Sequence, residues 1–337
     1  MRLLIRALRI LLSIGALGVS ALAVLAVLGF AVPYFDLLNH LQALLFIGTL
    51  LSLLFVPALL GRGVWRRFVL AATATGFFAS AITVVPEFTA SLQPRPPVPA
   101  SGQTVVKVMT HNLFGMNYDM LRVLDVIKRE QPDIIALQEF FGEQRSELGP
   151  LLKETYPYSV FCRGGKRANL GLFSKLPFTQ EQGAACPDDA YGAQRTGHIL
   201  GLFELPDGSH FSLMTTHLDW PAPKMARQRE EFAELQAAVA EVEGPLVVVG
   251  DFNSTSWSYA LRGFGRSTGL TRQDHGLLTY PALFYYLGGW RETLPFLPLD
   301  HVFTRGVAVH DLHTAGMTGS DHLPVVFTFT VDQGSPD

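Results

Sequence analysis

Cysteine is scarce in this chain, since only Cys162 and Cys186 occur among its 337 residues. Neither belongs to a CxxC pair, so the sequence gives no sign of a thiolate zinc site. If the segment that holds them is exported, it meets an oxidising compartment in which a disulfide persists. We therefore expect these two cysteines to pair, and the alternative is two buried thiols.

Charge is also scarce: 16% of the residues are charged, 48% are hydrophobic, and the mean hydropathy is +0.25. Three long runs hold almost no charge, namely residues 8–32 (Arg9 excepted), 41–60 and 68–85. Each approaches the roughly 17 to 25 residues that a helix needs to cross a bilayer. A cleaved signal peptide would explain only the first run. We predict three transmembrane helices that anchor the chain in a lipid bilayer.

Lysine and arginine are missing from residues 33–40, which connect the first two runs and carry Asp36. Arginines instead lie at the start of the first run and between the second and third runs, at Arg2, Arg6, Arg9, Arg62, Arg66 and Arg67. Because arginine-rich segments stay in the cytoplasm, the N-terminus should be cytoplasmic. Everything after Val85 should then lie on the extracytoplasmic (periplasmic) side of the cytoplasmic membrane.

The remainder of the chain has no basic surplus. Of 26 basic and 29 acidic residues, seven and two precede residue 103, so residues 103–337 hold 19 basic and 27 acidic residues, a formal charge of −8. A domain that binds long nucleic acid normally has a basic surface. Nucleic acid is therefore not favoured as a partner, although it is not excluded.

A proline-rich stretch, SLQPRPPVPASG (91–102), follows the apolar runs. Such sequences form extended, semi-rigid spacers. We predict a membrane domain over 1–90, a linker over 91–103 and a single large domain over 104–332.

Strand and helix patterns alternate through this large domain. Apolar or alternating stretches predict strands at 104–110, 133–139, 169–174, 198–205, 210–218, 246–251, 301–305 and 324–331. Helical spacing predicts helices near 120–131, 228–242 and 257–262. The turn PDGS (206–209) joins two strands as a hairpin. Hairpins together with crossovers predict an α/β domain in which packed mixed sheets are covered by helices.

Polar residues recur where the predicted strands begin or end. The positions are Asn112, Glu139, His217, Asp251 with Asn253, Asp300 with His301, and Asp321 with His322. Any one of them is explained by a turn or a cap. Six strand ends of this kind are much harder to explain by turns alone.

This set of residue types suits one kind of chemistry. Carboxylates and amides without thiolates favour a hard cation such as Mg²⁺. Histidines beside carboxylates suit general acid–base catalysis or donation to an oxyanion. Together they indicate hydrolysis of a phosphoester.

Six motifs in this order make the chain resemble the endonuclease/exonuclease/phosphatase superfamily, which includes deoxyribonucleases, abasic-site endonucleases, neutral sphingomyelinases and inositol-polyphosphate phosphatases. The motifs are HNLFG, the QE of DIIALQEF, TTHL, GDFN, LDHVF and SDHLP. The likeness covers roughly residues 104–331. With its apolar N-terminal runs, the chain is most similar to bacterial membrane-anchored members.

The resemblance implies a four-layer α/β/β/α sandwich and a role for each motif residue. Glu139 would be the principal ligand of Mg²⁺ or Mn²⁺, with Asn112 beside it and Asp321 supporting the metal or its waters. Asp251 would orient or deprotonate the attacking water, which Asn253 would hold. His322, oriented by Asp300, would contact the phosphate or act in acid–base catalysis, and His217 would be the second histidine.

Some points stay open. Phe114 stands where certain nucleases of the family have an acid, which argues against a second metal position, although the number of metal ions, one or two, is left open. Arg195 and Asn169 are candidate substrate contacts. The aromatic stretch 279–301 is either core packing, an apolar lid or a surface that meets lipid.

We expect a membrane-anchored, Mg²⁺-dependent phosphoesterase that hydrolyses a phosphodiester or phosphomonoester, such as a phospholipid or a small phosphoester, outside the cytoplasmic membrane. One alternative is a Mg²⁺-dependent nuclease that acts on DNA or RNA. Another is a membrane-tethered binding protein without catalytic activity, against which the complete set of motif residues argues.

The orientation predicts the result of a topology assay. Alkaline phosphatase fused after Asp337 should be active, because that enzyme folds only outside the cytoplasm. The same enzyme inserted between Arg62 and Arg66 should be inactive. An inactive fusion after Asp337, in a chain that is produced normally, would contradict the orientation.

Overall fold

The computed structural model describes residues 2–98, 102–163, 169–180, 196–223 and 225–332. The chain divides into two compact units. One comprises Met1–Leu92 and Thr255–Arg262, and the other comprises Gln93–Ser254 and Gly263–Asp337. Each unit has its own apolar core.

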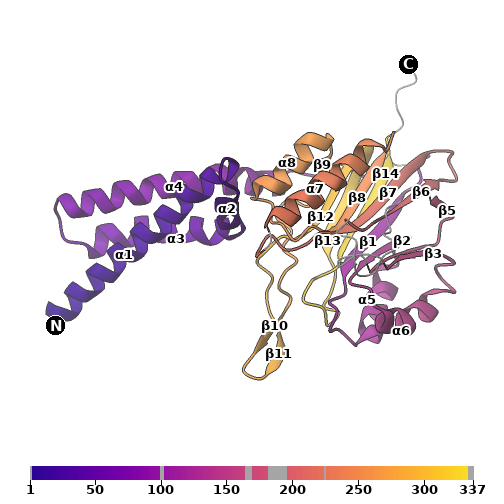
Figure 1. Ribbon diagram of the computed structural model, residues 1–337, viewed down its shortest axis with the longest axis horizontal. Coiled ribbons are helices and arrows are strands. Elements are labelled where there is room, and N and C mark those ends of the chain that lie inside the picture. The colour runs from indigo at the N-terminus through magenta and orange to yellow at the C-terminus, as the bar shows by residue number, and fades with distance from the viewer. Residues whose placement is uncertain (1, 99–101, 164–168, 181–195, 224, 333–337) are drawn as a thin grey trace, which may run out of the picture. The chain divides into compact units, whose positions relative to one another are not determined.

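Three long apolar helices make up most of the first unit (Figure 1). They are α1 (Arg2–Val27), α3 (Gln42–Leu59) and α4 (Val64–Ser91), and the short α2 (Pro33–Asp36) with two 3₁₀ turns, Leu28–Phe30 and Leu37–Leu41, connects the first two. Spans over Leu3–Phe30, Pro33–Leu59 and Val64–Ser91 are long and apolar enough to cross a bilayer. The three predicted helices are present, and they suggest a membrane protein.

Small residues let these helices approach closely. A Cβ atom on Gly76 would lie 2.6 Å from Cα of Ser20, and one on Gly48 would lie 2.9 Å from Cγ2 of Val19. Such contacts are typical of helix packing in lipid, where small side chains allow close van der Waals contact. Large apolar side chains face outward instead, among them Leu11, Ile14, Leu54, Phe55, Phe78 and Ile82.

Helix α4 is longer than the uncharged run predicts. It continues past Val85 to Ser91 with Pro86 inside it. A proline removes one backbone hydrogen bond, and helices of this kind tolerate it where the freed groups find other partners.

Two six-stranded sheets form the centre of the second unit. The first has the order β13 (Val307–Thr314), β14 (Val325–Val331), β1 (Val106–Asn112), β2 (Ile134–Gln138), β4 (Leu170–Ser174), β3 (Tyr158–Cys162). The second has the order β5 (Phe178–Gln180), β6 (His198–Glu204), β7 (His210–His217), β8 (Leu246–Asp251), β12 (Asp300–Arg305), β9 (Thr271–Arg272). Parallel pairs β1–β2 and β7–β8 stand within otherwise antiparallel sheets.

Alternation along the strands divides the core into layers. Val108 and Ala136 face the second sheet, in a cluster with its Val247 and Val302. The intervening side chains of β1 and β2, such as Met109 and Ile135, instead pack on helices α5 (Met120–Glu130) and α6 (Gly142–Leu152).

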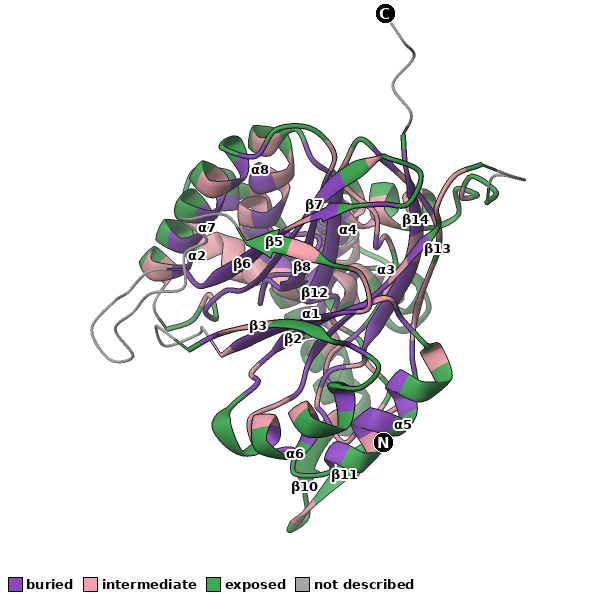
Figure 2. Cartoon of the chain, turned by 90° about the vertical axis from the view of Figure 1, so that its right-hand side faces the viewer, coloured by how far each residue is buried: buried purple, intermediate pink, exposed green. Residues whose placement is uncertain are grey.

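The second sheet is covered in the same way. Phe303 of β12 contacts Phe264 of α8 (Tyr259–Thr268), which in turn contacts Phe232 of α7 (Met225–Ala240). Figure 2 shows the strands of both sheets as mainly buried, with the exposed faces on the outer helices. The predicted four-layer α/β/β/α sandwich is confirmed.

Several elements were not predicted from the sequence. They are α6, β3, β5, β9, β13 and a separate two-stranded hairpin of β10 (Leu283–Tyr286) and β11 (Gly289–Glu292). Cys162, at the end of β3, is disulfide-bonded, and the only other cysteine of the sequence, Cys186, lies outside the described residues. The alternative of two buried free thiols is thus wrong for Cys162.

Gly250 lies where the packing leaves no room for a side chain. Its φ is +142°, and a Cβ atom there would lie 2.0 Å from the backbone oxygen of Thr216 on β7. Gly250→Ala should therefore lower the stability by at least about 2 kcal/mol. Gly263→Ala, in α8 with nothing within 4 Å of the added Cβ, should not lower it. Thermal unfolding of the detergent-solubilised proteins tests this, and equal midpoints for the two variants would contradict the packing at Gly250.

Candidate active site

His217, Asp251 and Asp300 lie side by side at one end of the second sheet. The parallel pair β7–β8 aligns His217 with Asp251, and the antiparallel pair β8–β12 aligns Asp251 with Asp300. Neighbouring strands lie about 5 Å apart, so side chains of aligned residues can meet. All three residues are buried.

The first sheet adds Asn112 and Glu139 to this row. Asn112 ends β1 and is aligned with Gln138, the last residue of β2, so Glu139 follows directly. The Asn112 Nδ2 atom donates to Asp251 Oδ2 at 2.9 Å and to Glu139 Oε1 at 3.4 Å. The amide of Asn112 thereby joins carboxylates that come from different sheets. Glu139 Oε2 also accepts the backbone N–H of Gly115 at 2.7 Å.

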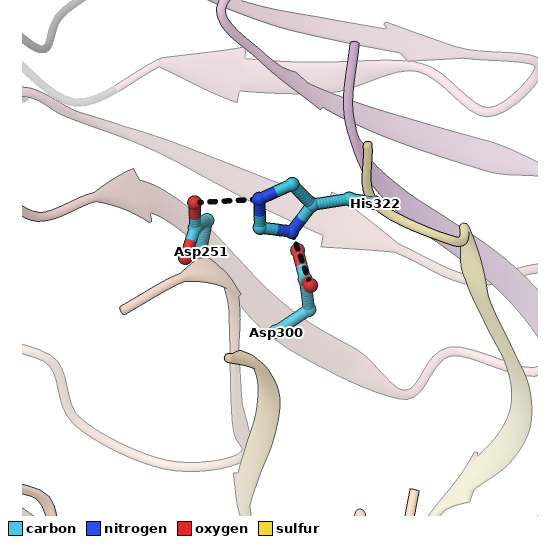
Figure 3. Close-up of side chains that lie close together, drawn as sticks. All are labelled: Asp251, Asp300 and His322. Atoms are coloured by element: carbon cyan, nitrogen blue, oxygen red, sulfur yellow. Dashed lines mark hydrogen bonds and ion pairs between the residues drawn. The ribbon is translucent and has the colours of Figure 1, made fainter. Parts of the chain in front are cut away.

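His322 precedes β14 and forms a buried pair with Asp300. Its Nδ1 donates to Asp300 Oδ2 at 2.7 Å, and its Nε2 lies 3.6 Å from Asp251 Oδ2 (Figure 3). Burial by itself lowers the pKa of His322. The charges of Asp300 and Asp251, with the Asp300 hydrogen bond, outweigh burial and raise this pKa to about 10. Without a metal ion, His322 is an imidazolium at neutral pH.

The two aspartates beside His322 have pKa values close to neutral. Burial raises the pKa of Asp251 to about 7; the charge of Asp300 adds to this rise, and the charge of His322 opposes it. Burial also raises the pKa of Asp321 to about 6, with opposition from His322 and reinforcement from Glu139. A carboxylate whose pKa is near 7 can accept a proton and release it again at physiological pH.

Asn253 connects His217 to the turn after β8. Its Nδ2 donates to the backbone oxygen of Leu218 at 2.9 Å and lies 3.2 Å from His217 Nε2. Its own backbone N–H donates to Asp251 Oδ1 at 2.8 Å, in a turn where Asn253 has φ +47°. His217 Nε2 is 3.5 Å from Asp251 Oδ2 and 3.9 Å from Glu139 Oε1. The sequence GDFN thus forms a tight turn that points both polar side chains into the site.

The site has the ligand atoms that a cation needs. Asn253 Oδ1 and Asp300 Oδ1 are buried and have no hydrogen-bond partner among the described residues. Asp251, Asp300 and His322 have potential ligand atoms that all lie within 4.8 Å of one another. A buried oxygen without a partner is costly, and a bound cation would remove that cost. This buried group could therefore bind a metal ion.

The remaining predicted residues are placed as follows. Asp321 is half-buried and lies near enough to Glu139 and His322 for their charges to affect its pKa. The backbone of Asn169 adjoins the site, because its oxygen accepts the N–H of Phe140, the residue after Glu139, at 2.8 Å. Arg195 lies outside the described residues.

Three supporting residues were not predicted. The ring of Tyr280 lies 4.9 Å, centroid to centroid, from that of His322. The Ser320 hydroxyl accepts the backbone N–H of His322 and donates to the oxygen of Asn112. Gln228 of α7 donates to the backbone oxygens of Phe252 and Asn253. The pair Arg227–Gln228 after TTHL is the one sequence signal that could have indicated Gln228.

His301, which also opens β12, does not join the site. Its Nδ1 faces Asp274 Oδ2 at 2.7 Å and its Nε2 faces the backbone oxygen of Ser254 at 2.7 Å. His301 is buried, and its contact with Ser254, the residue after GDFN, supports the turn that GDFN forms.

Comparison with known proteins identifies similar chains. The profile described as "Endonuclease/Exonuclease/phosphatase family" matches residues 109–322. A UPF0294 protein of Vibrio vulnificus is 28% identical over 135 residues, which are 40% of this chain and 44% of that protein. This chain spans less than half the length of the curated relatives it matches.

Solved structures share the fold, among them two bacterial proteins. An endonuclease/exonuclease/phosphatase from Bacteroides vulgatus has a TM-score of 0.53 and 21% identity over 68% of this chain and 100% of its own. One from Beutenbergia cavernae has a TM-score of 0.52 and 20% identity over 68% of this chain and 72% of its own.

The His322–Asp300 pair predicts a titration. In EDTA-treated protein, the ¹³Cε1 NMR signal of His322 should titrate near pH 10. Asp300→Asn should lower that midpoint by about 1 to 3 pH units. A histidine whose pKa is raised on folding stabilises the protein below its unfolded pKa, near 6.5, and this contribution disappears as the pH rises towards 10. A midpoint near 6.5 in the unsubstituted protein would contradict the pairing.

Proposed function

Because the chain belongs to the endonuclease/exonuclease/phosphatase family, whose fold is typical of metal-dependent phosphoester hydrolases, we propose that it is a membrane-anchored, Mg²⁺-dependent phosphoesterase. It would hydrolyse a phosphodiester or phosphomonoester outside the cytoplasmic membrane, with Mn²⁺ able to replace Mg²⁺. The observation that carries the proposal is the meeting of Asn112 and Glu139 with Asp251 and His322 at one end of the two sheets.

Oxygen ligands would hold the cation. Glu139 is the principal ligand in this proposal, with Asp321 nearby and Asn112 beside it. The Asn112 Nδ2 faces the carboxylates, and its Oδ1 accepts the N–H of Phe114 at 2.9 Å; the amide therefore also fixes the position of Glu139. When bound, Mg²⁺ neutralises charge on the phosphate and makes water a better nucleophile.

Asp251 and His322 would move the protons. Asp251, with its pKa near 7, takes a proton from the water that Asn253 holds, and the water oxygen bonds to phosphorus. His322, held by Asp300, donates its Nε2 proton to the leaving oxygen as the P–O bond breaks. The 3.6 Å between His322 Nε2 and Asp251 Oδ2 lets the proton return to His322 afterwards. His217, whose Nε2 lies 3.5 Å from the same Oδ2 atom of Asp251, would help to hold that carboxylate in place.

The organisation of the chain supports this reading. The proposed membrane domain (1–90) and linker (91–103) would hold the catalytic domain (104–332) at the extracytoplasmic surface. The formal charge of −8 on residues 103–337 opposes the binding of long nucleic acid, which is itself negatively charged. A phospholipid or a small phosphoester is therefore a better substrate than DNA or RNA.

The catalytic proposal predicts hydrolysis of bis(p-nitrophenyl) phosphate in the presence of Mg²⁺ and its loss in EDTA. Asp251→Ala and His322→Ala should each lower kcat/KM by about 10² to 10⁴-fold, because each removes a proton-transfer group. Release of p-nitrophenol measures the rate directly.

Matched controls are Asp125→Ala and His210→Ala, since both side chains are exposed and lie on α5 and β7, outside the site. They should keep the activity of the unsubstituted protein. Activity that survives both EDTA and the site substitutions would contradict the proposed residues. No activity on nucleic acids, phospholipids or sugar phosphates would favour the non-catalytic alternative.

A further inference from the structure

The hairpin β10–β11 leaves a group of large apolar side chains exposed. Among the described residues its strands pair only with each other, from Leu283 with Glu292 to Tyr286 with Gly289. Leu287 and Gly288 close it with positive φ values of 50° and 80°, as a tight two-residue turn requires. Figure 1 shows the hairpin projecting from the rest of its domain, and Figure 2 shows it as largely exposed.

The exposed side chains are aromatic and aliphatic. Between 45% and 82% of the surface of each remains accessible in Phe284, Tyr285, Tyr286, Leu287 and Trp290. Leu294 and Phe296, just after the hairpin, are 89% and 47% exposed. Single exposed apolar residues are ordinary, but a contiguous group of this kind marks an interaction surface.

Charge is absent from the tip. Residues 276–290 contain no Asp, Glu, Lys or Arg. The first charges after them are Arg291 and Glu292, and Glu292 is paired with Arg122 at the base. The tip can therefore enter an apolar medium without burying a charge, which is the main cost of such a transfer.

We propose that this hairpin tip inserts into the interface of a lipid bilayer. Tyrosine and tryptophan prefer that depth, where the ring is buried and the hydroxyl or indole N–H stays near water. The three apolar N-terminal helices suggest that a bilayer is the surface to which the chain is anchored. A lipid surface also needs no matching shape, which suits a hairpin that packs on no third strand.

The hairpin is joined to the candidate active site. Trp290 packs against Phe114 at 5.3 Å between ring centroids, and the residue after Phe114, Gly115, donates to Glu139. At the start of the hairpin, Ala282 N–H donates to the backbone oxygen of Asp321 at 2.6 Å. Tyr280, two residues earlier in the chain, packs on His322. Insertion of the tip would thus bring the carboxylates to the lipid surface.

The inference narrows the proposed function, on which it rests, to phosphoesters that are displayed at a bilayer. A lipid headgroup then reaches the site while the rest of the lipid stays in the membrane. Because the tip is uncharged, the docking itself should not depend on headgroup charge.

Trp290 reports insertion without any need for catalysis. In full-length protein held in nanodiscs, lipids brominated in the acyl chains should quench most of the Trp290 emission, obtained as the difference between the unsubstituted protein and Trp290→Phe. Quenching should be equal in zwitterionic and anionic bilayers. No quenching of Trp290, either by the nanodisc lipid or by added brominated vesicles, would overturn the proposal.

Activity gives the second measurement. A triple variant, Tyr285→Ser, Tyr286→Ser and Leu287→Ser, should hydrolyse bis(p-nitrophenyl) phosphate as before but lose at least about tenfold in activity on a long-chain phospholipid in vesicles. The control triple variant, Val105→Ser, Leu151→Ser and Tyr158→Ser, removes exposed apolar groups elsewhere in the domain and should match the unsubstituted protein on both substrates.

The two proposals can fail separately. If no phosphoester is hydrolysed, the proposed function fails. Quenching of Trp290 then still shows whether the hairpin tip inserts into the bilayer. If the soluble diester is cleaved while the tip variant keeps full activity on vesicles, the hairpin inference is wrong and the function stands. A tip variant that changes the protein from dimer to monomer in light scattering would show that the tip binds a second copy, which would also overturn lipid insertion.

Discussion

The carboxylates gathered at one end of the sheets set the conditions for the rest of the site. Asp251 and Asp300 are buried, Glu139 and Asp321 are close by, and burial makes each negative charge costly. Positive charge close to them lowers that cost. His322 supplies one positive charge through its hydrogen bond to Asp300, and a bound cation would supply more, while the buried oxygens Asn253 Oδ1 and Asp300 Oδ1 have no hydrogen-bond partner among the described residues. This need for charge balance links the fold to the proposed metal-dependent chemistry.

Much of this arrangement could be predicted from the sequence, because the polar residues interrupt apolar strands. LVVVGDFN contains a buried strand, a glycine that no other residue can replace without a clash, and the acid and amide that follow. What the sequence could not give was the register that aligns His217 with Asp251 and Asp300, since register depends on partners far along the chain. The contact of Tyr280 with His322 could not be predicted for the same reason, because the two residues are far apart in the sequence.

Other elements were missed for local reasons. Helix α6 contains Gly149 and Pro150, which weaken a helical pattern, and β13 has a bulge between Val309 and Asp311 that breaks its alternation. From composition alone, the aromatic residues of 279–301 were compatible both with a buried core and with an exposed surface. The structure shows that many of them are exposed, in a hairpin whose two strands pair with no third strand among the described residues.

The most direct test of the charge balance is Mn²⁺ binding followed by electron paramagnetic resonance in the purified full-length protein. The account predicts saturable binding that Mg²⁺ displaces, that Glu139→Gln and Asp251→Asn weaken by at least about tenfold, and that Asp125→Asn leaves unchanged. Binding that is absent, or that is equal in all of these proteins, would contradict a cation held at this group of carboxylates.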